Sequence, residues 1–371
     1  MKTKLFILSI LMLVLTACEK EHPNYDWKDI SLKNDIDLTS IYMLDDETGF
    51  VGGNSGVKIE EIITHMGDIP SPYGDTLIYS PNNENSYVEY KYDVDQDIEP
   101  ILYKTTDGGS SWQSITTPFK IGIKDIQFFN ENTGYVVSKG EGVYKTIDGG
   151  REWNKILANR IHVYYGQGFN DPFDAVCFIN ENTGFVYGTT SSNVVLSTKN
   201  GGLTWDCVSI AYTGKTSEKY PEIFSSVSEI AFPNSKDTGY ILSGKILYKT
   251  VNQGATWVKV YESDYRFNPV FYNSSTVFLP EQHVYTQNGG VTWNKTPLFH
   301  FGEDMVTPNL NEFYYLNNGE IRRTISGQQE WYDMSKENDS WVHELTFPSE
   351  NTGYAIGNES LILKYTKRQF E

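Results

Sequence analysis

The chain has 371 residues and a formal net charge of −18, with 26 tyrosines, 31 glycines and three cysteines. The strong negative charge argues against nucleic acid and against anionic membrane surfaces as partners. The abundance of Tyr and Gly is typical of an all-β protein with many turns.

The N-terminus carries a secretion signal. Lys2 and Lys4 precede the apolar run LFILSILMLVL, which is too short and too close to the N-terminus for a membrane span. The next residues, LTAC at 15–18, resemble the lipobox of bacterial lipoproteins, in which the signal is cut before the cysteine and the cysteine receives lipid. We therefore predict a signal peptide at 1–17 and lipidation of Cys18.

This signal implies a protein of the cell envelope. Cleavage removes two lysines and no acid, so the mature chain is still more negative. A linker at 18–26 would hold the folded body close to the membrane of a Gram-negative-type bacterium. Lys20 stands where Asp would favour retention in the inner membrane, so we expect the outer membrane or the cell surface.

A unit of about forty residues recurs along the rest of the chain. Each copy opens with an alternating strand and a TG turn, as in DIQFFNENTGYVVS (125–138) and ELTFPSENTGYAIG (344–357). A second strand follows, and a third ends in YKT or a similar tripeptide. A glycine corner then leads to a tryptophan and a fourth strand, as in YKTTDGGSSW (103–112).

The copies predict a closed ring. The seventh copy, 342–370, stops after its third strand, and WKDI at 27–30 matches the missing fourth strand. A borrowed terminal strand is how β-propellers close. We therefore predict a seven-bladed β-propeller over 27–371 with four-stranded blades, the last completed by the N-terminal strand. An insertion at about 54–98 lies between the second and third strands of the first blade.

The repeat also decides the state of two cysteines. Cys177 lies on a first strand and Cys207 on the fourth strand of the same blade. Three strand spacings separate them by roughly 14 Å, whereas a disulfide needs Cα atoms within about 7 Å. We predict two free, packed thiols.

The glycine corner resembles the Asp-box, or bacterial neuraminidase repeat, T-x-D-x-G-x-[ST]-W. Asp or Asn accepts backbone hydrogen bonds within its own turn, and Trp packs between neighbouring sheets. Because a catalytic residue is needed once and these recur in most blades, we predict a structural role. The positions are Asp107, Trp112, Asp148, Trp153, Asn200, Trp205, Asn252, Trp257, Asn288 and Trp293.

The NENTGY turns followed by YKTxDGGxxW also resemble propellers of the photosystem II stability and assembly factor family. In that family the propeller is a non-enzymatic assembly factor that binds proteins. The resemblance implies a non-catalytic binding module, although the Arg patches typical of the family are not expected with only six Arg in the chain.

Loop lengths indicate a working face. The TG turns and the glycine corners share one face, whereas the connectors between blades and the turns between second and third strands share the other, which carries the long loops. Function in repeat folds tends to lie where loops depart from the minimal turn. We predict a ligand face formed by Tyr164, Tyr165, Phe169, Tyr212, Tyr220, Tyr265, Phe299 and His300.

We expect no cofactor and no metal. In the acidic insertion, Asp93, Asp95, Asp97 and Glu99 alternate like the start of a calcium loop, but Ile98 replaces the glycine and the closing Glu is absent. The partner would be an envelope protein or an extracellular glycan, bound by a monomer.

The alternative is a glycoside hydrolase, because Asp-box propellers include sialidases. No Arg precedes Arg151, so the arginine triad of that chemistry is not evident. A pair of carboxylates remains open as the catalytic set. The candidates are Asp171, Asp174, Glu222, Glu262, Asp264, Glu303 and Asp304.

Overall fold

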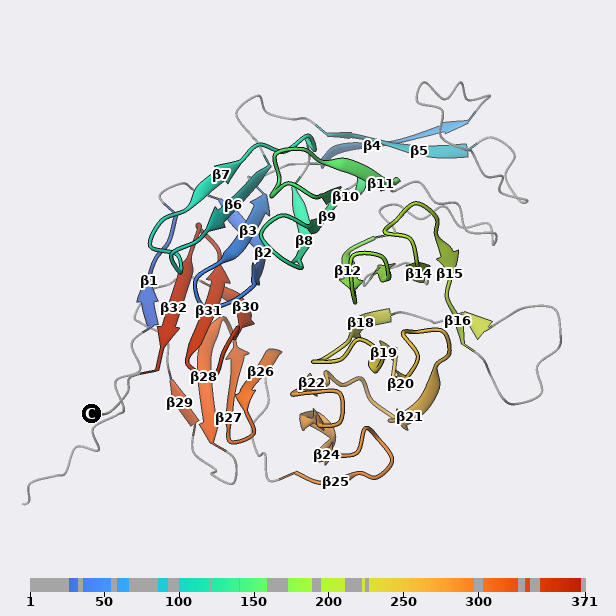
Figure 1. Ribbon diagram of the computed structural model, residues 1–371, viewed down its shortest axis with the longest axis vertical. Helices are drawn as coiled ribbons and strands as arrows, with labels where there is room; N and C mark the ends of the chain where they lie inside the picture. The colour runs from blue at the N-terminus through green and yellow to red at the C-terminus, as the bar shows by residue number, and fades with distance from the viewer. Residues whose placement is uncertain are drawn as a thin grey trace, which may run out of the picture.

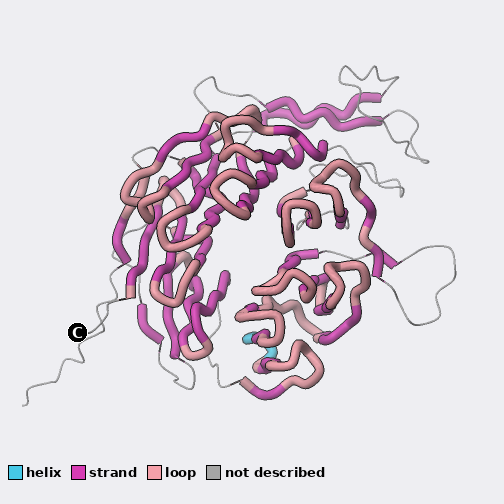
Figure 2. Tube along the Cα trace, viewed as in Figure 1, coloured by secondary structure: helices cyan, strands magenta, loops and turns pink. Residues whose placement is uncertain are grey.

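The computed structural model describes residues 27–32, 36–54, 59–66, 86–92, 100–120, 122–139, 141–158, 173–188, 195–210, 222–223, 227–296, 303–325, 331–333 and 341–367. Within them, seven four-stranded antiparallel sheets form a ring (Figure 1). The only helical element of these ranges is the 3₁₀ turn η1 (Pro280–Gln282), and Figure 2 shows strand and loop elsewhere. The predicted seven-bladed propeller is confirmed.

Each sheet is one blade, and six of the seven are continuous in sequence. Blade 1 consists of β2 (Asp37–Met43), β3 (Gly49–Asn54), β6 (Ile101–Thr105) and β7 (Gln113–Ile115). Blade 2 consists of β8 (Ile123–Phe128), β9 (Gly134–Ser138), β10 (Gly142–Thr146) and β11 (Asn154–Ala158). Blade 3 consists of β12 (Ala175–Phe178), β13 (Gly184–Tyr187), β14 (Val195–Thr198) and β15 (Asp206–Cys207). Blade 4 consists of β18 (Val227–Ala231), β19 (Gly239–Ser243), β20 (Ile246–Thr250) and β21 (Val258–Glu262). Blade 5 consists of β22 (Val270–Phe271), β23 (Val277–Leu279), β24 (Val284–Thr286) and β25 (Asn294–Lys295). Blade 6 consists of β26 (Glu303–Asn309), β27 (Glu312–Asn317), β28 (Glu320–Ile325) and β29 (Trp331–Asp333). Blade 7 consists of β30 (Val342–Thr346), β31 (Thr352–Gly357), β32 (Ile362–Thr366) and the N-terminal strand β1 (Trp27–Asp29).

Two small sheets are added to the ring. The hairpin of β4 (Ile59–Met66) and β5 (Ser86–Tyr92) lies between β3 and β6 in the chain and extends outward from the ring in Figure 1. The pair of β16 (Ser209–Ile210) and β17 (Glu222–Ile223) lies between blades 3 and 4.

The N-terminal strand closes the ring. In Figure 1 β1 lies beside β32, and the register pairs Trp27 with Tyr365 and Asp29 with Leu363. Trp27 is 1% exposed and packs on the rings of Tyr365 and Phe347, with centroids 5.6 and 6.3 Å away. The prediction that the N-terminal strand completes the last blade is therefore confirmed.

The closure repeats a contact found elsewhere in the ring. Tyr354 Oη and Lys364 Nζ of blade 7 donate to two backbone carbonyls of blade 1, at 2.8 and 2.9 Å. In the same positions of blade 2, Tyr135 Oη and Lys145 Nζ donate to the Glu181 carbonyl of blade 3, at 3.0 and 3.2 Å. The Tyr of the TG turn and the Lys of YKT thus bind the next blade, and the seam between the chain ends uses the same pair.

The glycine of the TG turn is explained by close packing. A Cβ on Gly134 would lie 2.4 Å from the ring of Phe128, and one on Gly184 would lie 2.2 Å from the ring of Phe178. The same arrangement recurs in two further pairs, Phe232 with Gly239 and Phe347 with Gly353. Because each ring lies directly on the backbone of the second strand, no side chain fits there.

The two cysteines of blade 3 are free. Cys177 lies on the first strand and Cys207 on the fourth, as expected, so the prediction that they form no disulfide is confirmed. Cys177 is buried, but Cys207 is exposed. The prediction of a packed thiol is therefore wrong for Cys207, because its strand is the outermost of the blade and borders solvent.

Candidate binding site in the central channel

The glycine corners hold themselves together. We call residues 105–112, 146–153, 198–205, 250–257 and 286–293 the Trp corners. In the first, Asp107 accepts hydrogen bonds from the hydroxyl and the N–H of Ser111, at 2.6 and 2.8 Å, and from Thr105 Oγ1 at 2.9 Å. The bonds from Ser111 hold the pKa of Asp107 below its ordinary value.

The other corners repeat this geometry. Asp148, Asn200, Asn252 and Asn288 each accept the N–H of the residue four positions further on, at 2.9–3.0 Å. Each is therefore engaged inside its own turn. These contacts support the structural role expected of the corner acids and amides.

The corner tryptophans pack between blades. Trp257 is 1% exposed and meets the ring edges of Phe185 in blade 3 and Phe232 in blade 4, at 6.0 and 6.2 Å. Trp205 Nε1 donates to the Ile156 carbonyl of the preceding blade at 3.2 Å. Each such ring joins two sheets, which explains why the motif recurs from blade to blade.

The opposite face carries the connectors. The connector between blades 4 and 5 bonds to turns between second and third strands, because Ser263 Oγ donates to Gln282 at 2.8 Å and the backbone N–H of Asn268 donates to Glu281 at 3.2 Å. Tyr265 on this connector is 75% exposed. The other expected members of the ligand face, Tyr164, Tyr165, Phe169, Tyr212, Tyr220, Phe299 and His300, lie outside the described residues, as do Cys18 and the acids at 93–99.

The first strands line the central channel. In Figure 1, β2, β8, β12, β18, β22, β26 and β30 lie nearest the centre. In blades 1, 2, 4 and 7 the first strand bulges at the same place, directly before Ser40, Asp125, Glu229 and Glu344. A bulge re-aims the next side chain, and three of the four positions hold a carboxylate.

Most channel acids bind the neighbouring blade. Asp125 accepts the N–H of Val176 in blade 3 at 2.8 Å, and Asp304 accepts that of Leu345 in blade 7. Glu344 accepts a backbone N–H of blade 1. The first strand is the inner edge of its sheet, so no further strand pairs with its outer backbone N–H groups. The carboxylates accept hydrogen bonds from some of these N–H groups.

Blades 2 and 3 are joined at two more points. Lys124 Nζ lies 2.6 Å from Asp174, and the Gln127 amide both donates to the Phe178 carbonyl and accepts its N–H, at 3.0 and 2.6 Å. Asp174, one of the carboxylates considered for hydrolysis, is therefore used in an ion pair between blades.

The acids affect one another. Desolvation by the surrounding protein raises the pKa of the half-buried Asp125 to about 7 and that of Asp304, which as a whole residue is exposed, to about 6. Burial and the nearby charge of Asp304 raise the pKa of Glu229 to about 8. Burial also raises the pKa of Glu344 well above its ordinary value, and the charges of Asp304 and Asp125 add to this. The channel thus holds a group of carboxyls that resist ionisation together.

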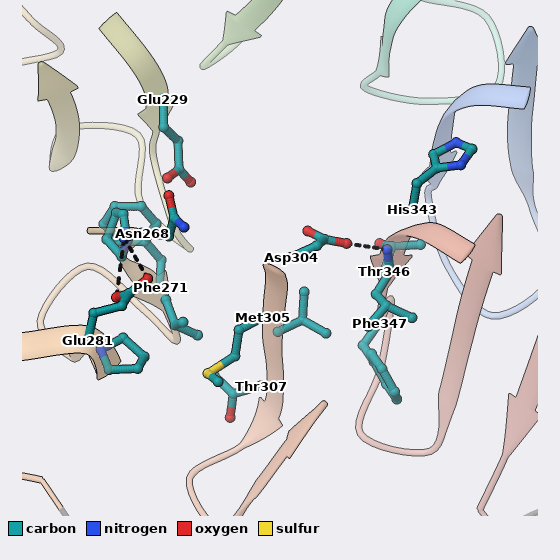
Figure 3. Close-up of a pocket in the computed structure, with 15 residues that line it drawn as sticks. Glu229, Asn268, Phe271, Glu281, Asp304, Met305, Thr307, His343, Thr346 and Phe347 are labelled. Atoms are coloured by element: carbon teal, nitrogen blue, oxygen red, sulfur yellow. Dashed lines mark hydrogen bonds between the residues drawn. The ribbon is translucent and has the colours of Figure 1, made fainter. Parts of the chain in front are cut away.

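A cavity of 630 Å³ opens among the first strands of blades 4 to 7 (Figure 3). Figure 3 shows Glu229, Asn268 and Glu281 on one side of it, with Asp304, Thr346 and His343 across from them. Its lining also includes Pro269, Val270, Phe271, Pro280, Met305, Val306, Thr307, Leu345 and Phe347. Asn268 ends the connector that carries Tyr265, so the cavity adjoins the predicted ligand face.

The sequence contains a signal for this site that is separate from the aromatic residues of the loops. The tetrapeptides DIQF, EIAF and ELTF share one pattern: an acid, an apolar residue, any residue and then Phe. Their acids are Asp125, Glu229 and Glu344. Each lies at the bulge of a first strand. Repetition at one position of the unit marks these acids as residues of the channel wall, and of the three it is Glu229 that lines the cavity.

Metal binding is not indicated. Among the side chains that the structure describes, no group of three or more His, Cys, Asp or Glu has an arrangement that could hold a metal ion. No helix in the described ranges is both long and apolar enough to cross a membrane.

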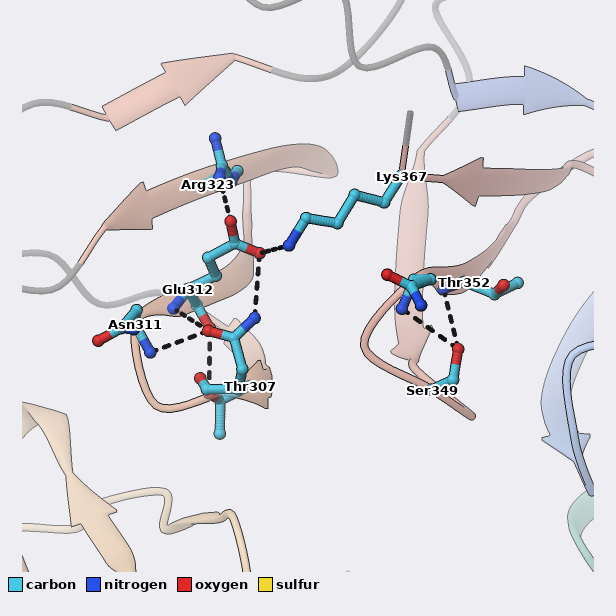
Figure 4. Close-up of polar contacts among 9 residues, drawn as sticks. Thr307, Asn311, Glu312, Arg323, Ser349, Thr352 and Lys367 are labelled. Atoms are coloured by element: carbon cyan, nitrogen blue, oxygen red, sulfur yellow. Dashed lines mark hydrogen bonds and ion pairs between the residues drawn. The ribbon is translucent and has the colours of Figure 1, made fainter. Parts of the chain in front are cut away.

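A second charged cluster lies in blade 6, around Glu312 (Figure 4). Glu312 pairs with Arg323, which is 2% exposed, at 2.5 Å and with Lys367 at 3.6 Å. Burial opposes ionisation of Glu312, but Arg323 and Lys367 hold its pKa below the ordinary value. Since Lys367 follows the last strand, this cluster fixes the C-terminal end of the ring to blade 6.

Fold and site define a seven-bladed β-propeller with an acid-lined cavity at its axis. Residues 104–218 match the model of the family described as photosynthesis system II assembly factor YCF48. The resemblance inferred from the TG turns and glycine corners is thus confirmed. No curated protein sequence matches the chain.

Solved structures share the fold. YCF48 bound to D1 peptide is 15% identical, with a TM-score of 0.59 over 93% of this chain and 98% of the other. YCF48 from Cyanidioschyzon merolae is 14% identical, with a TM-score of 0.58 over 92% and 98%. A catalytically inactive virginiamycin B lyase from Staphylococcus aureus is 11% identical, with a TM-score of 0.57 over 93% and 100%. Because both binding proteins and an enzyme appear, the fold alone does not decide the function.

Proposed function

We propose that the protein is a non-catalytic binding propeller that recognises a protein partner at the mouth of its central channel. The cavity between blades 4 and 7 carries this proposal. It combines apolar walls with a few convergent polar groups, which is the usual composition of binding sites, and its volume lies within their range of about 300–1,000 Å³.

Two further observations support a protein partner. The repeats of residues 104–218 match those of an assembly-factor family, and one solved propeller of that family is a complex with a peptide. In addition, Tyr265 stands 75% exposed on the connector that leads into the cavity. Exposed tyrosines are typical anchors of protein interfaces, and they also stack on sugars, so an extracellular glycan is the second ligand class to test.

The proposal includes a place in the cell. Lipid on Cys18 would hold the propeller on the outer membrane or the cell surface, with the linker at 18–26 keeping it near the bilayer. Several acyl chains, at about 0.8 kcal/mol per buried CH₂, would make this attachment firm.

Affinity capture from the protein's own envelope tests the proposal. The tagged full-length chain is cross-linked in cells and purified from membranes, and Tyr265→Ala and Leu203→Ala are treated in parallel. Leu203 is an 83% exposed residue of a Trp corner, on the opposite face, and serves as the control. We expect one envelope protein in stoichiometric yield with the wild type and Leu203→Ala, and a several-fold lower yield with Tyr265→Ala.

Three outcomes would contradict the proposal. Capture of polysaccharide without protein would replace the protein partner by a glycan. Equal loss of the partner in Leu203→Ala would move the interface to the corner face. If a Cys18→Ser variant stays in the membrane fraction, lipid on Cys18 is not what attaches the protein to the membrane.

A glycoside hydrolase is the second candidate, because Glu229 and Asp304 line one cavity and have raised pKa values. A carboxyl that holds its proton near neutral pH suits a general acid. Against this, Asp304 already accepts the N–H of Leu345. Release of reducing ends from envelope polysaccharides by the wild type, lost in Asp304→Asn, would establish the hydrolase instead.

A further inference from the structure

The charge of the cavity is unbalanced. Among the residues that the structure describes, its lining contains the carboxyls of Glu229, Glu281 and Asp304 but neither Lys nor Arg. His343 is the only basic side chain in the described part of the lining, and burial lowers the pKa of this imidazole, so that it is neutral at physiological pH. The described lining therefore offers acceptors for a cation and no cation of its own.

Glu229 is the lining carboxyl to which the described residues supply no partner. Asp304 accepts the N–H of Leu345, and Glu281 accepts the N–H of Asn268. Among the described residues, none donates a hydrogen bond to the Glu229 carboxylate or forms an ion pair with it, although protein surrounds it on the channel wall. Figure 3 shows this carboxylate beside the side-chain amide of Asn268, across the cavity from Asp304. Glu229 is half-buried, and a ligand donor would complete the hydrogen bonding of its carboxyl.

The rest of the cavity suits an alkyl stem. Phe271, Met305 and Phe347 line the cavity, and Figure 3 shows Phe271 on the side of Glu229, Phe347 on the side of Thr346 and Met305 between them. Long basic side chains bury their methylene stems on apolar surface and place the charged head among acceptors. A metal ion would use none of this apolar wall, and no metal-binding group of side chains is found in the described part of the chain.

We propose that the cavity receives a lysine or arginine side chain of the protein partner, with its stem along Phe271 and Met305 and its charged head at Glu229 and Asp304. This inference rests on the proposed function and names the chemistry that the partner must present. Recognition would depend on one inserted basic residue, in the manner of an interface anchor held in a pocket.

Binding should be coupled to a proton. Glu229 holds a proton near neutral pH in the empty cavity, because burial and then the charge of Asp304 raise its pKa to about 8. A cation beside it would displace that proton, so affinity should increase with pH. The other ionisable groups around this space are Glu281 from η1, Asp304 from β26, His343 and Glu344 from β30 and Asp125 from β8.

The test compares two synthetic heptapeptides, capped at both ends, that differ only at the central residue. One carries lysine and the other norleucine, which has the same stem without the ammonium group. Binding to the full-length protein in detergent is measured by calorimetry, for the wild type, Glu229→Gln and the control Glu350→Gln. Glu350 is an exposed acid of a TG turn on the other face.

We expect the lysine peptide to bind the wild type and Glu350→Gln at least about tenfold more tightly than the norleucine peptide, which corresponds to about 1.4 kcal/mol. This preference should be lost in Glu229→Gln, together with the increase of affinity between about pH 6 and 8. Because glutamine matches the shape of a protonated glutamate, Glu229→Gln should remain folded, which its unfolding midpoint verifies.

Equal affinities for the two peptides, or no binding of either, would overturn the inference. So would competition by free spermidine or by Ca²⁺ that is as strong as that of the lysine peptide, since the site would then take a small cation. If affinity capture still yields a partner that Glu229→Gln retains, the proposed function stands and only the basic residue in the cavity is refuted.

Discussion

Replacement of Trp27 by Ala should destabilise the protein by about 3–5 kcal/mol, the usual cost of removing a large buried aromatic side chain. Trp27 is 1% exposed and anchors β1 to β32 through Tyr365 and Phe347. It is also the first residue of the strand that completes blade 7. Its loss therefore creates a cavity at the one seam that the chain itself does not connect.

Urea unfolding followed by tryptophan fluorescence and circular dichroism measures this effect. Trp341→Ala is the matched control, because Trp341 is 48% exposed, and the loss there should be well under half as large. A cost for Trp27→Ala no greater than that of the control would mean that β1 does not hold the ring closed.

The stability of the protein should be greatest in mildly acidic solution and should fall by about 2–4 kcal/mol between pH 5 and 8. The channel acids cause this, because the half-buried Asp125 and Glu229 have folded pKa values of about 7 and 8. Below the ordinary pKa of a carboxyl, the carboxyls are protonated in both the folded and the unfolded chain, so they do not lower the stability. As the pH rises toward the folded values, the unfolded chain ionises first and is favoured.

Glu312 acts in the opposite direction at lower pH. Its pKa is held down by Arg323 and Lys367 against the effect of burial, so its contribution is present above the ordinary carboxyl pKa and is lost as the pH falls through its folded value. Together the two effects place the maximum of stability in the mildly acidic range.

Chemical denaturation at a series of pH values, with Glu229→Gln beside the wild type, tests the channel contribution. The variant should gain stability over the wild type as the pH rises from 5 to 8, whereas Glu350→Gln should follow the wild type. Parallel curves for Glu229→Gln and the wild type would show that this carboxyl does not resist ionisation in the folded protein.

The repeat made the architecture predictable from the sequence. The TG turns, the YKT strands and the Trp corners each recur, so a local pattern could be assigned with the support of its copies, and the incomplete seventh copy pointed to Trp27. The packing behind the pattern was not predictable, since nothing in the sequence tells that Gly134 lies beneath the ring of Phe128.

The site was less accessible to sequence reasoning. The search favoured long loops with aromatic residues, of which Tyr265 is the member whose exposure the structure describes. Asp125, Glu229 and Glu344 were overlooked because they are far apart in the chain and lie in strands that read as ordinary alternation. Only the ring brings them to one axis, and only the bulge before each turns its side chain toward it.

Photo-crosslinking in living cells tests the central claim most directly. A photoreactive amino acid is placed at Thr346, which lines the cavity, and in a second strain at Leu203 on the corner face. The account predicts a single protein adduct from position 346 and none from position 203. An adduct from position 203 alone, or glycan adducts in place of protein at position 346, would contradict it.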